Sequence, residues 1–492
     1  MNAVLKPQAI IPSAHQEAIY SFVTEGEGNA IVEAVAGSGK TTTLVEAIRR
    51  IIGRSNIFLA FNKSIAEELK KRGVNARTFH SLCFSPVLRA KGVKDISAQK
   101  TRDIIDARFG DKDARMYGPF INRLVGLAKN SGIGCLMDDT EQNWSDLASH
   151  HDLELEDENA DYATALRFAS EVLQLSNQVK ALDFDDLLYF AVKDGISLPK
   201  FDFVFVDEAQ DTNSIQRAIL RKIMHSNSRL VAVGDPAQAI YGFRGSDSDS
   251  LDLIASEFNA KRLPLTVSYR CPTSVIEHAR QWVSHIEAAP AAPAGKVDDL
   301  NQSWGPKTFV ADDLVVCRTT KPLVSLAYQL LTSRVPVRIL GKDIGAGMKS
   351  LIKKMNPKGI NGLVEKLNAY TVREVEKARA KKLDAKAEAI QDKTDCVLFL
   401  IQTLEENNRT VPALLAVIDR LFADGVNTVL LATIHKAKGL EADRVYWMNS
   451  RSCPAKWARQ GWQQQQERNL CYVATTRAKV ELYLIEEQKD KE

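Results

Sequence analysis

Short, mostly apolar runs recur along the chain, and each ends in polar or small residues. Four of them lie in the first half, at residues 30–35, 57–61, 203–206 and 230–233. Such runs are typical of strands that are buried on both faces of a parallel sheet. Ligands of such sheets bind beyond the carboxyl ends of the strands. The polar residues that follow these runs therefore mark a candidate ligand site.

Similar runs return far downstream, at residues 314–317, 429–432, 445–448 and 482–485. A chain of 492 residues is also too long for one core. We therefore predict an α/β protein with two tandem domains, each with a parallel sheet and each interrupted by a mainly helical insertion. The predicted segments are 1–84 and 181–262 for the first domain, 85–180 for its insertion, 263–348 and 425–492 for the second domain, and 349–424 for its shorter insertion.

The segments between the runs contain local helix signals. Ser64 to Glu67 reads as a capping box at the start of a helix. Glu67 and Lys71, like Glu68 and Arg72, are then spaced to form ion pairs one turn apart.

Charge is distributed unevenly over the two insertions. Residues 138–161 hold ten acidic and no basic side chains, which favours a solvated loop or helix face over a partner site. Residues 349–393 read as charged helix with lysine-rich faces such as 379–382. A solvated helix is the simpler interpretation there, and contact with nucleic-acid phosphates is the alternative.

Composition narrows the class of protein only slightly. The 65 basic and 62 acidic residues give a net charge of +3, so a basic groove would need local clustering. Seven scattered cysteines form no C-x-x-C pair, which predicts free thiols in a reducing compartment. No apolar run is long enough to span a membrane. We expect a cytoplasmic location, while a nuclear one stays open.

The strongest chemical signal is A-V-A-G-S-G-K-T at residues 34–41, between a predicted strand and a helix that starts near Thr41. Its glycines let backbone N–H groups face phosphate oxygens, and the helix N-terminus adds positive potential. In such loops Lys40 reaches the β- and γ-phosphates and the Thr41 hydroxyl ligates Mg²⁺. The general pattern has Gly where this chain has Ala34. ATP and Mg²⁺ are therefore the expected cofactors.

A second acidic signal follows the strand at 203–206. Asp207 can hold the Mg²⁺, and Glu208 is placed to orient or deprotonate the attacking water. Capping of the next helix by Asp207 is the structural alternative. Together with the phosphate loop, the pair predicts hydrolysis of a nucleoside triphosphate, but it does not say what work is done.

Further motifs appear in a fixed order: H-Q-E-A-I at 15–19, A-F-N-K at 60–63, T-F-H-S-L at 78–82, G-D-P-A-Q-A-I-Y-G-F-R-G at 234–245, S-Y-R at 268–270, T-I-H-K-A-K-G-L-E at 433–441 and Y-V-A-T-T-R-A at 472–478. With the phosphate loop and V-D-E-A-Q-D at 206–211, they resemble the UvrD/Rep group of superfamily 1 helicases over most of the chain. The resemblance implies two tandem RecA-like P-loop domains with ATP bound in the cleft between them.

The resemblance also assigns nucleotide residues. It makes Gln16 the reader of adenine, Tyr269 a ring stacked on adenine and Glu441 a contact to the ribose. Gln238 would sense the γ-phosphate, with Arg270 and Arg477 touching it. The expected nucleotide site is thus Gln16, Gly37, Ser38, Gly39, Lys40, Thr41, Thr42, Tyr269, Arg270, Glu441 and Arg477, and the expected catalytic set is Lys40, Asp207, Glu208, Gln238, Arg270 and Arg477.

The same resemblance predicts a track for single-stranded DNA. Aromatic rings suit such a track because they stack on any base without reading sequence. The expected residues are Phe61, Asn62, Lys63, Thr78, Phe79, His80, Tyr241, Phe243, Arg244, His435 and Lys438. For Tyr241 and Phe243, burial in a core is the structural alternative.

We therefore expect an ATP-driven DNA helicase that moves 3′ to 5′ on single-stranded, tailed or forked DNA, with RNA as a minor alternative. Three departures from the family qualify this. The aromatic in A-F-N-K is shifted by one position, as in the branch of F-box and phage-type helicases. The second insertion is short. Little chain follows Arg477, where larger members place a strand-separating hairpin, and residues 453–466 with their tryptophans are a substitute or ordinary packing.

Two other functions stay open. One is a DNA-stimulated ATPase that remodels protein–DNA or recombination intermediates with little unwinding. The other is a P-loop enzyme indifferent to DNA, against which the predicted stacking residues argue.

Overall fold

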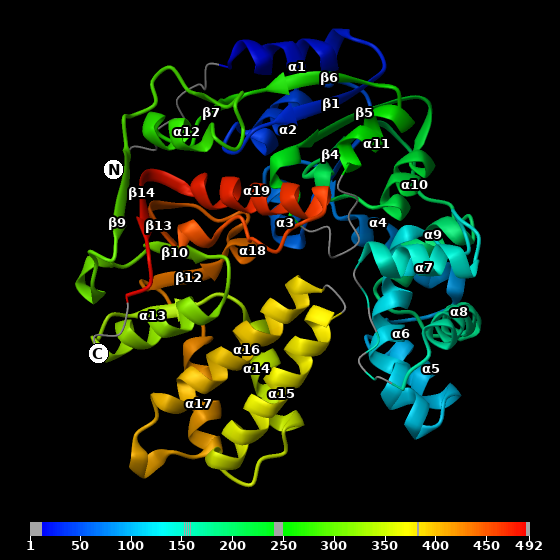
Figure 1. Ribbon diagram of the computed structural model, residues 1–492. Coiled ribbons are helices and arrows are strands. Elements are labelled where there is room, and N and C mark those ends of the chain that lie inside the picture. Colours follow the sequence, from blue (N-terminus) through cyan, green and yellow to red (C-terminus); the bar gives the residue numbers. More distant parts are fainter. Residues whose placement is uncertain are drawn as a thin grey trace, which may run out of the picture. The chain divides into compact units, whose positions relative to one another are not determined.

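The computed structural model describes residues 12–151, 153, 155, 157, 159–240, 249–380 and 383–488. The chain divides into two compact units, one made of residues 1–35 and 39–266 and the other of residues 36–38 and 267–492. Each unit holds a six-stranded parallel sheet (Figure 1). The predicted α/β fold with two tandem parallel sheets is therefore confirmed.

The first sheet brings three strand ends to one edge. Its strand order is β3-β2-β4-β5-β1-β6, so β4, β5 and β1 are neighbours. In the register, Val206 pairs with Ala232 and Glu33 with Gly234, so the loops after these strands start at nearly the same level. The strands are β1 Asn29–Ala34, β2 Asn56–Leu59, β3 Ala76–Arg77, β4 Phe201–Val206, β5 Met224–Gly234 and β6 Ala260–Leu265.

Helices cover both faces of this sheet, which explains why its strands are apolar throughout. On one face the core is shared with α1 Ala14–Glu25, α2 Lys40–Arg49 and α3 Lys63–Lys71. On the other face it is shared with α4 Phe79–Lys91, α9 Asp186–Lys193, α10 Ser214–Lys222 and α11 Ser250–Glu257.

The first insertion is helical, as expected, and its core is continuous with that of the sheet. Its helices are α5 Lys100–Arg108, α6 Asp111–Ser131, α7 Glu141–His150 and α8 Tyr162–Gln178. A buried ion cluster ties it to α9. Lys100 and Lys129 contact the two oxygens of Asp186 at 2.6 and 2.7 Å, and Lys129 also contacts Asp183 at 2.6 Å. No signal in the sequence pointed to this cluster.

The predicted capping box at Ser64 is wrong. The helix α3 begins at Lys63, one residue earlier, and its cap is Asn62, whose side-chain oxygen accepts the N–H of Ile65 at 2.9 Å. Asn is as good a cap as Ser, so the earlier residue takes the role. Glu68 pairs with Arg72 as expected, whereas Glu67 pairs with Lys70.

The second sheet has the strand order β11-β12-β10-β13-β14-β9, and all four downstream runs form strands of it. A separate two-stranded sheet joins β7 Val267–Ser268 to β8 Glu287–Ala288. The six strands are β9 Lys296–Asn301, β10 Leu314–Cys317, β11 Val337–Ile339, β12 Val429–Thr433, β13 Ala442–Met448 and β14 Ala478–Ile485; the helices are α12 Thr273–Ala279, α13 Lys321–Thr332, α18 Ile434–Ala437 and α19 Gly461–Thr475.

The second insertion is also helical, and residues 349–393 belong to three helices. These are α14 Lys342–Lys354, α15 Ile360–Ala380 and α16 Asp384–Gln402, and α17 Val411–Leu421 follows them. Their apolar faces share one core with the second sheet. The carboxylate of Asp392 accepts the N–H groups of Thr320 and Lys321 at 2.7–3.0 Å and so caps α13. The insertion is thereby fixed to the sheet.

The tryptophan-containing segment 453–466 forms no pair of strands. It consists of a turn and the first part of α19. Among the described residues, no helix is both long and apolar enough to cross a bilayer.

Candidate nucleotide and nucleic-acid sites

The loop between β1 and α2 has the backbone of an anion site. Gly37 and Gly39 adopt left-handed conformations, with φ of 71° and 78°. Gly39 is the N-cap of α2 and provides no side-chain oxygen to the first turn of the helix. The N–H groups at this helix start are therefore available to an anion, and the helix adds positive potential. Within the loop, the buried Ser38 hydroxyl also has no hydrogen-bond partner among the described residues.

Gln16 is held beside the phosphate loop. Its Oε1 accepts the N–H of Ser13 at 2.9 Å, and its Nε2 donates to Oγ1 of Thr43 at 3.1 Å. Thr43 in turn donates to the carbonyl of Gly39 at 2.9 Å. The amide still has acceptor and donor capacity for a base edge. Thr43, which was missing from the predicted site, is the residue that joins Gln16 to the loop, whereas the predicted Thr42 is exposed on α2.

The predicted metal ligands meet. Thr41 Oγ1 donates to Asp207 Oδ2 at 2.7 Å, across 166 residues of sequence. Burial and the neighbouring Glu208 raise the pKa of Asp207 to about 6, although the Thr41 hydrogen bond and Lys40 lower it. A hydroxyl and a carboxylate are hard oxygen ligands of the kind that Mg²⁺ takes. A cation here would also offset the buried negative charge, so the residues present fit Mg²⁺.

The raised pKa of Asp207 predicts a cost in stability that depends on pH. Between about pH 4 and pH 6 the folded chain keeps a proton that the unfolded chain releases, so the free energy of unfolding falls as pH rises through this window. At pH 7.5, without nucleotide or metal, we expect Asp207→Asn to raise the free energy of unfolding by about 1–3 kcal/mol. At pH 5 the increase should be smaller, because Asp207 is then mostly protonated in the folded parent. Chemical denaturation at both pH values measures this.

Asp202→Asn is the control. The pKa of Asp202 is lowered by hydrogen bonds from Ser55 and His225, so this variant should lose stability at pH 7.5. An Asp207→Asn protein no more stable than the parent at pH 7.5 would contradict the conclusion that the buried charge of Asp207 destabilises the fold.

A chain of hydrogen bonds connects the predicted catalytic residues. Gln210 Nε2 donates to Glu208 Oε2 at 2.5 Å, and Gln210 Oε1 accepts the N–H of Asp235 at 3.0 Å. Gln238 Nε2 donates to Asp235 Oδ2 at 2.6 Å. Glu208 itself has a left-handed backbone, with φ of 52°, a conformation that residues other than Gly, Asn and Asp seldom adopt. Gln210 therefore positions Glu208, and Asp235 positions Gln238.

The chain of hydrogen bonds through Gln210 requires a glycine at position 234. A Cβ at Gly234 would lie 2.6 Å from Oε1 and 3.0 Å from the backbone N of Gln210. We expect Gly234→Ala to displace Gln210 and with it Glu208, and to lower ATP turnover about 10²-fold, as displacement of a catalytic group by about 1 Å does. Steady-state ATPase measurements test this. Gly126→Ala is the matched control, because its Cβ would meet its nearest neighbour at an ordinary 3.4 Å. Equal turnover in the two variants would count against the positioning role.

In the second unit, three predicted nucleotide residues also come together. Arg270 follows β7, and its Nε lies 2.6 Å from Glu441 Oε2. Arg477 is 1% exposed and donates from Nε to the carbonyl of Val473 at 2.9 Å and from NH1 to that of Leu440 at 3.1 Å. The register that pairs Ala442 with Ala478 places Glu441 beside Arg477. The Tyr269 ring, next to Arg270, is 46% exposed.

Two helix starts at the carboxyl edge of the first sheet present the predicted DNA residues. Asn62 caps α3, and Thr78 caps α4 by accepting the N–H of Ser81 at 3.1 Å. Lys63 is the first residue of α3, and Phe61 beside it is 46% exposed. The caps explain the local role of Asn62 and Thr78, and a DNA contact of either stays a prediction.

The expectation for Phe79 requires correction. Its ring is 7% exposed and lies in the core between the first sheet and its insertion, so it has no face to offer to a base. The exposed ring here is Phe184, which lies just before α9 and is 55% exposed. It stacks on His80, with ring centroids 3.9 Å apart and planes at 15°. Burial lowers the pKa of His80 to about 4, so the stacked imidazole is neutral at pH 7.

Of the remaining predicted DNA residues, the structure describes two and leaves three outside the described ranges. Tyr241, Phe243 and Arg244 lie outside the described residues. His435 is on α18 and Lys438 follows it, both half-buried at the carboxyl end of β12.

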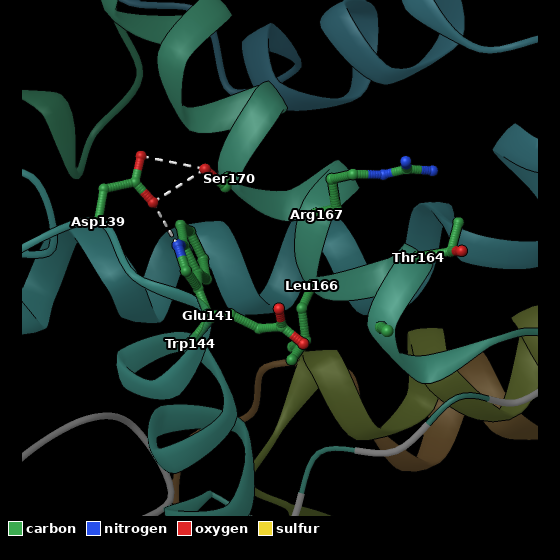
Figure 2. A pocket seen from close by; sticks show the side chains of 8 residues that line it. Asp139, Glu141, Trp144, Thr164, Leu166, Arg167 and Ser170 are labelled. Carbon is green, nitrogen blue, oxygen red and sulfur yellow. Dashed lines mark hydrogen bonds between the residues drawn. The ribbon is translucent and has the colours of Figure 1, made fainter.

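A separate cavity of about 360 Å³ lies in the first insertion, between α7 and α8 (Figure 2). Within it Asp139 accepts hydrogen bonds from Trp144 Nε1 at 2.6 Å and Ser170 Oγ at 2.9 Å. At least this residue of the acidic stretch therefore has a structural role. No residue of the phosphate loop lines the cavity; its lining is Asp139, Glu141, Trp144, Ala163, Thr164, Leu166, Arg167 and Ser170.

Two family models match the chain. Residues 15–259 match the UvrD/REP helicase N-terminal domain, and residues 353–489 match the UvrD-like helicase C-terminal domain. Among curated relatives, a probable DNA helicase II homolog of Mycoplasma pneumoniae is 29% identical over 55% of this chain and 42% of its own length. The ATP-dependent DNA helicase PcrA of Bacillus subtilis is 24% identical over 93% of this chain and 80% of its own.

A third relative, the F-box DNA helicase protein 1 of Schizosaccharomyces pombe, is 26% identical over 92% of this chain and 55% of its own length. The chain thus spans about two fifths of the first of these relatives and just over half of the third.

Proposed function

The chain belongs to the UvrD/Rep-like helicase family, and on that premise we propose that it is an ATP-dependent DNA helicase that moves 3′ to 5′ along single-stranded DNA. The resemblance drawn from the motifs is confirmed by both family matches. The observation that carries the proposed activity is the contact of Thr41 with Asp207 beside the uncapped start of α2. It unites a phosphate site with a metal site, as hydrolysis of ATP requires.

In this proposal the residues of the first unit bind and orient the reactants. The start of α2 and Lys40 hold the phosphates, and the Gln16 amide reads the adenine edge. Glu208, fixed by Gln210, orients the attacking water and accepts its proton. Thr41 and Asp207 would hold Mg²⁺, which, when bound, neutralises charge on the phosphate oxygens. The second unit supplies Arg270 and Arg477 to the γ-phosphate, Tyr269 to the adenine and Glu441 to the ribose.

The track for DNA rests on two features of the first unit. The starts of α3 and α4 attract phosphates, because both helices point their N-termini to the same edge of a parallel sheet. The exposed rings of Phe61 and Phe184 offer faces to bases. Neither feature reads base sequence, which suits a motor that must pass over any strand. Single-stranded DNA, reached through a tail or a fork, is the proposed substrate, in the cytoplasm or nucleoid.

Phe184 provides a direct test of this track. We expect Phe184→Ala to weaken binding of an oligothymidine about 5- to 150-fold, since one base–ring stack contributes about 1–3 kcal/mol. Fluorescence anisotropy measures the affinity. Phe84→Ala is the matched control, because Phe84 is an exposed ring of the same unit that lies on the body of α4 rather than at its start. Equal affinities of the two variants for the oligothymidine would mean that Phe184 does not stack on the DNA.

A second candidate function is remodelling of protein–DNA or recombination intermediates with little unwinding. The absence of strands from 453–466, all of which the structure describes, favours it, because this segment then provides no hairpin to divide a duplex. The ATPase residues are the same in both functions.

Strand displacement separates the two functions. A short strand is annealed to leave either a 3′ or a 5′ tail, and its release is followed with ATP, using Lys40→Ala as the blank. Release from the 3′-tailed duplex alone is the expected result and fixes the polarity. No release from either duplex, with DNA-stimulated ATPase intact, would favour remodelling. ATPase unaffected by DNA would overturn both.

A further inference from the structure

Two buried thiols of the second unit face each other. Cys453 lies in the turn before α19, Cys471 lies within α19, and their Sγ atoms are 3.2 Å apart. Cys453 is 6% exposed and Cys471 is fully buried. All seven cysteines are free thiols in the structure. A disulfide has an S–S distance of about 2.0 Å, so these sulphurs would have to approach by only about 1 Å more.

The surrounding contacts hold the turn against the helix. Glu467, one helical turn before Cys471, accepts the N–H of Ala455 at 2.9 Å through Oε2. The same carboxylate accepts two hydrogen bonds from Arg318 at 2.7 Å. Since Glu467 and Cys471 lie on one face of α19, the bond to Ala455 brings Cys453 over the Cys471 thiol. The folded chain therefore holds the two sulphurs together at little further entropic cost.

We propose that Cys453 and Cys471 are a site of reversible oxidation, which peroxide converts to an intramolecular disulfide. The Cys453 thiolate attacks one oxygen of hydrogen peroxide, the O–O bond breaks, and the departing hydroxide takes up a proton to give water. The sulfenic acid left on Cys453 is then attacked by the sulphur of Cys471. The S–S bond forms, the S–OH bond breaks, and the hydroxide leaves as water with the Cys471 proton. Two thiols are oxidised and one peroxide is reduced to two waters.

The first step is slow at neutral pH. The hydrogen bond between the two thiols and burial raise the pKa of Cys453, Glu467 raises it further, and Arg318 lowers it. Thiolate is the reactive form, so the rate of oxidation should rise with pH. Cys453 takes the peroxide because it is the less buried of the two thiols.

The test uses the folded full-length protein. It is incubated with hydrogen peroxide at pH 8.5, free thiols are blocked with iodoacetamide under denaturing conditions, and the digest is analysed by mass spectrometry without reductant. We expect one linked peptide pair that joins Cys453 to Cys471, lighter by two hydrogens, and its loss after dithiothreitol. The five other cysteines serve as internal controls and should be recovered in the alkylated form, because peroxide leaves them as free thiols.

Single variants check the pairing. After peroxide, Cys471→Ser should leave Cys453 as a sulfenic acid that dimedone traps, with no linked peptide. Circular dichroism checks that the variant is folded. If the variant does not fold, the peptide analysis of the unsubstituted protein still tests the proposal. The proposal is overturned if Cys453 and Cys471 remain alkylated under conditions that oxidise an exposed reference thiol, or if either one links to another cysteine instead.

Discussion

Replacement of Arg477 by Ala should lower the rate of ATP hydrolysis by about 10³- to 10⁵-fold while single-stranded DNA still binds. An arginine supplied to the γ-phosphate stabilises the charge that develops in the transition state, and effects of this size are general for NTPases. In the structure the guanidinium is already ordered by the carbonyls of Val473 and Leu440. Such preorganisation reduces the entropy lost on binding phosphate. Steady-state ATPase with saturating oligothymidine measures the rate.

The same hydrogen bonds demand a control, because Arg477→Ala also removes donors from buried carbonyls and should reduce stability. Arg229 offers a match. It is buried in the first unit and donates to the carbonyls of Phe22, Val23 and Gly28 at 2.6–3.0 Å. Arg229→Ala should therefore lose comparable stability but keep turnover. If the two variants lost turnover in proportion to their loss of stability, Arg477 would be a structural residue and not a catalytic one.

The parts of the site that could be predicted from sequence depend on strand ends. Lys40, Thr41 and Asp207 meet because β1 and β4 are parallel strands of one sheet whose carboxyl ends share an edge. A parallel sheet places such residues together whatever the length of the insertion between them. The strands themselves were visible because burial on both faces leaves continuous apolar runs.

The parts that could not be predicted depend on side-chain neighbours. In the sequence Gly234 looks like any glycine at a strand end. A glycine is required there because Gln210 packs where a Cβ would lie. Phe184 and His80 are 104 positions apart in sequence and meet only in the folded unit. The burial of Phe79 follows from the direction that α4 takes as it leaves β3, which the motif T-F-H-S-L does not encode.

Replacement of Glu208 by Gln should lower ATP turnover by about 10²- to 10⁴-fold, the usual contribution of a general base. Gln has nearly the same shape as Glu and can still accept the hydrogen bond from Gln210, so the left-handed backbone at this position should persist. What is lost is the negative charge that takes the proton of the attacking water. We therefore expect the affinity for a fluorescent ATP analogue to stay within a few-fold of that of the parent, with the loss confined to turnover.

The double variant with Gly234→Ala decides whether Glu208 acts as described. If Gly234→Ala lowers turnover by displacing Gln210 and so misplacing Glu208, its effect should nearly vanish once Glu208 is Gln, because the group being positioned is already inactive. Fully additive losses in the two variants would mean that Gly234 acts through another route, such as the neighbouring Asp235. Near-complete non-additivity would identify Gln210 as the residue through which the end of β5 controls the catalytic carboxylate.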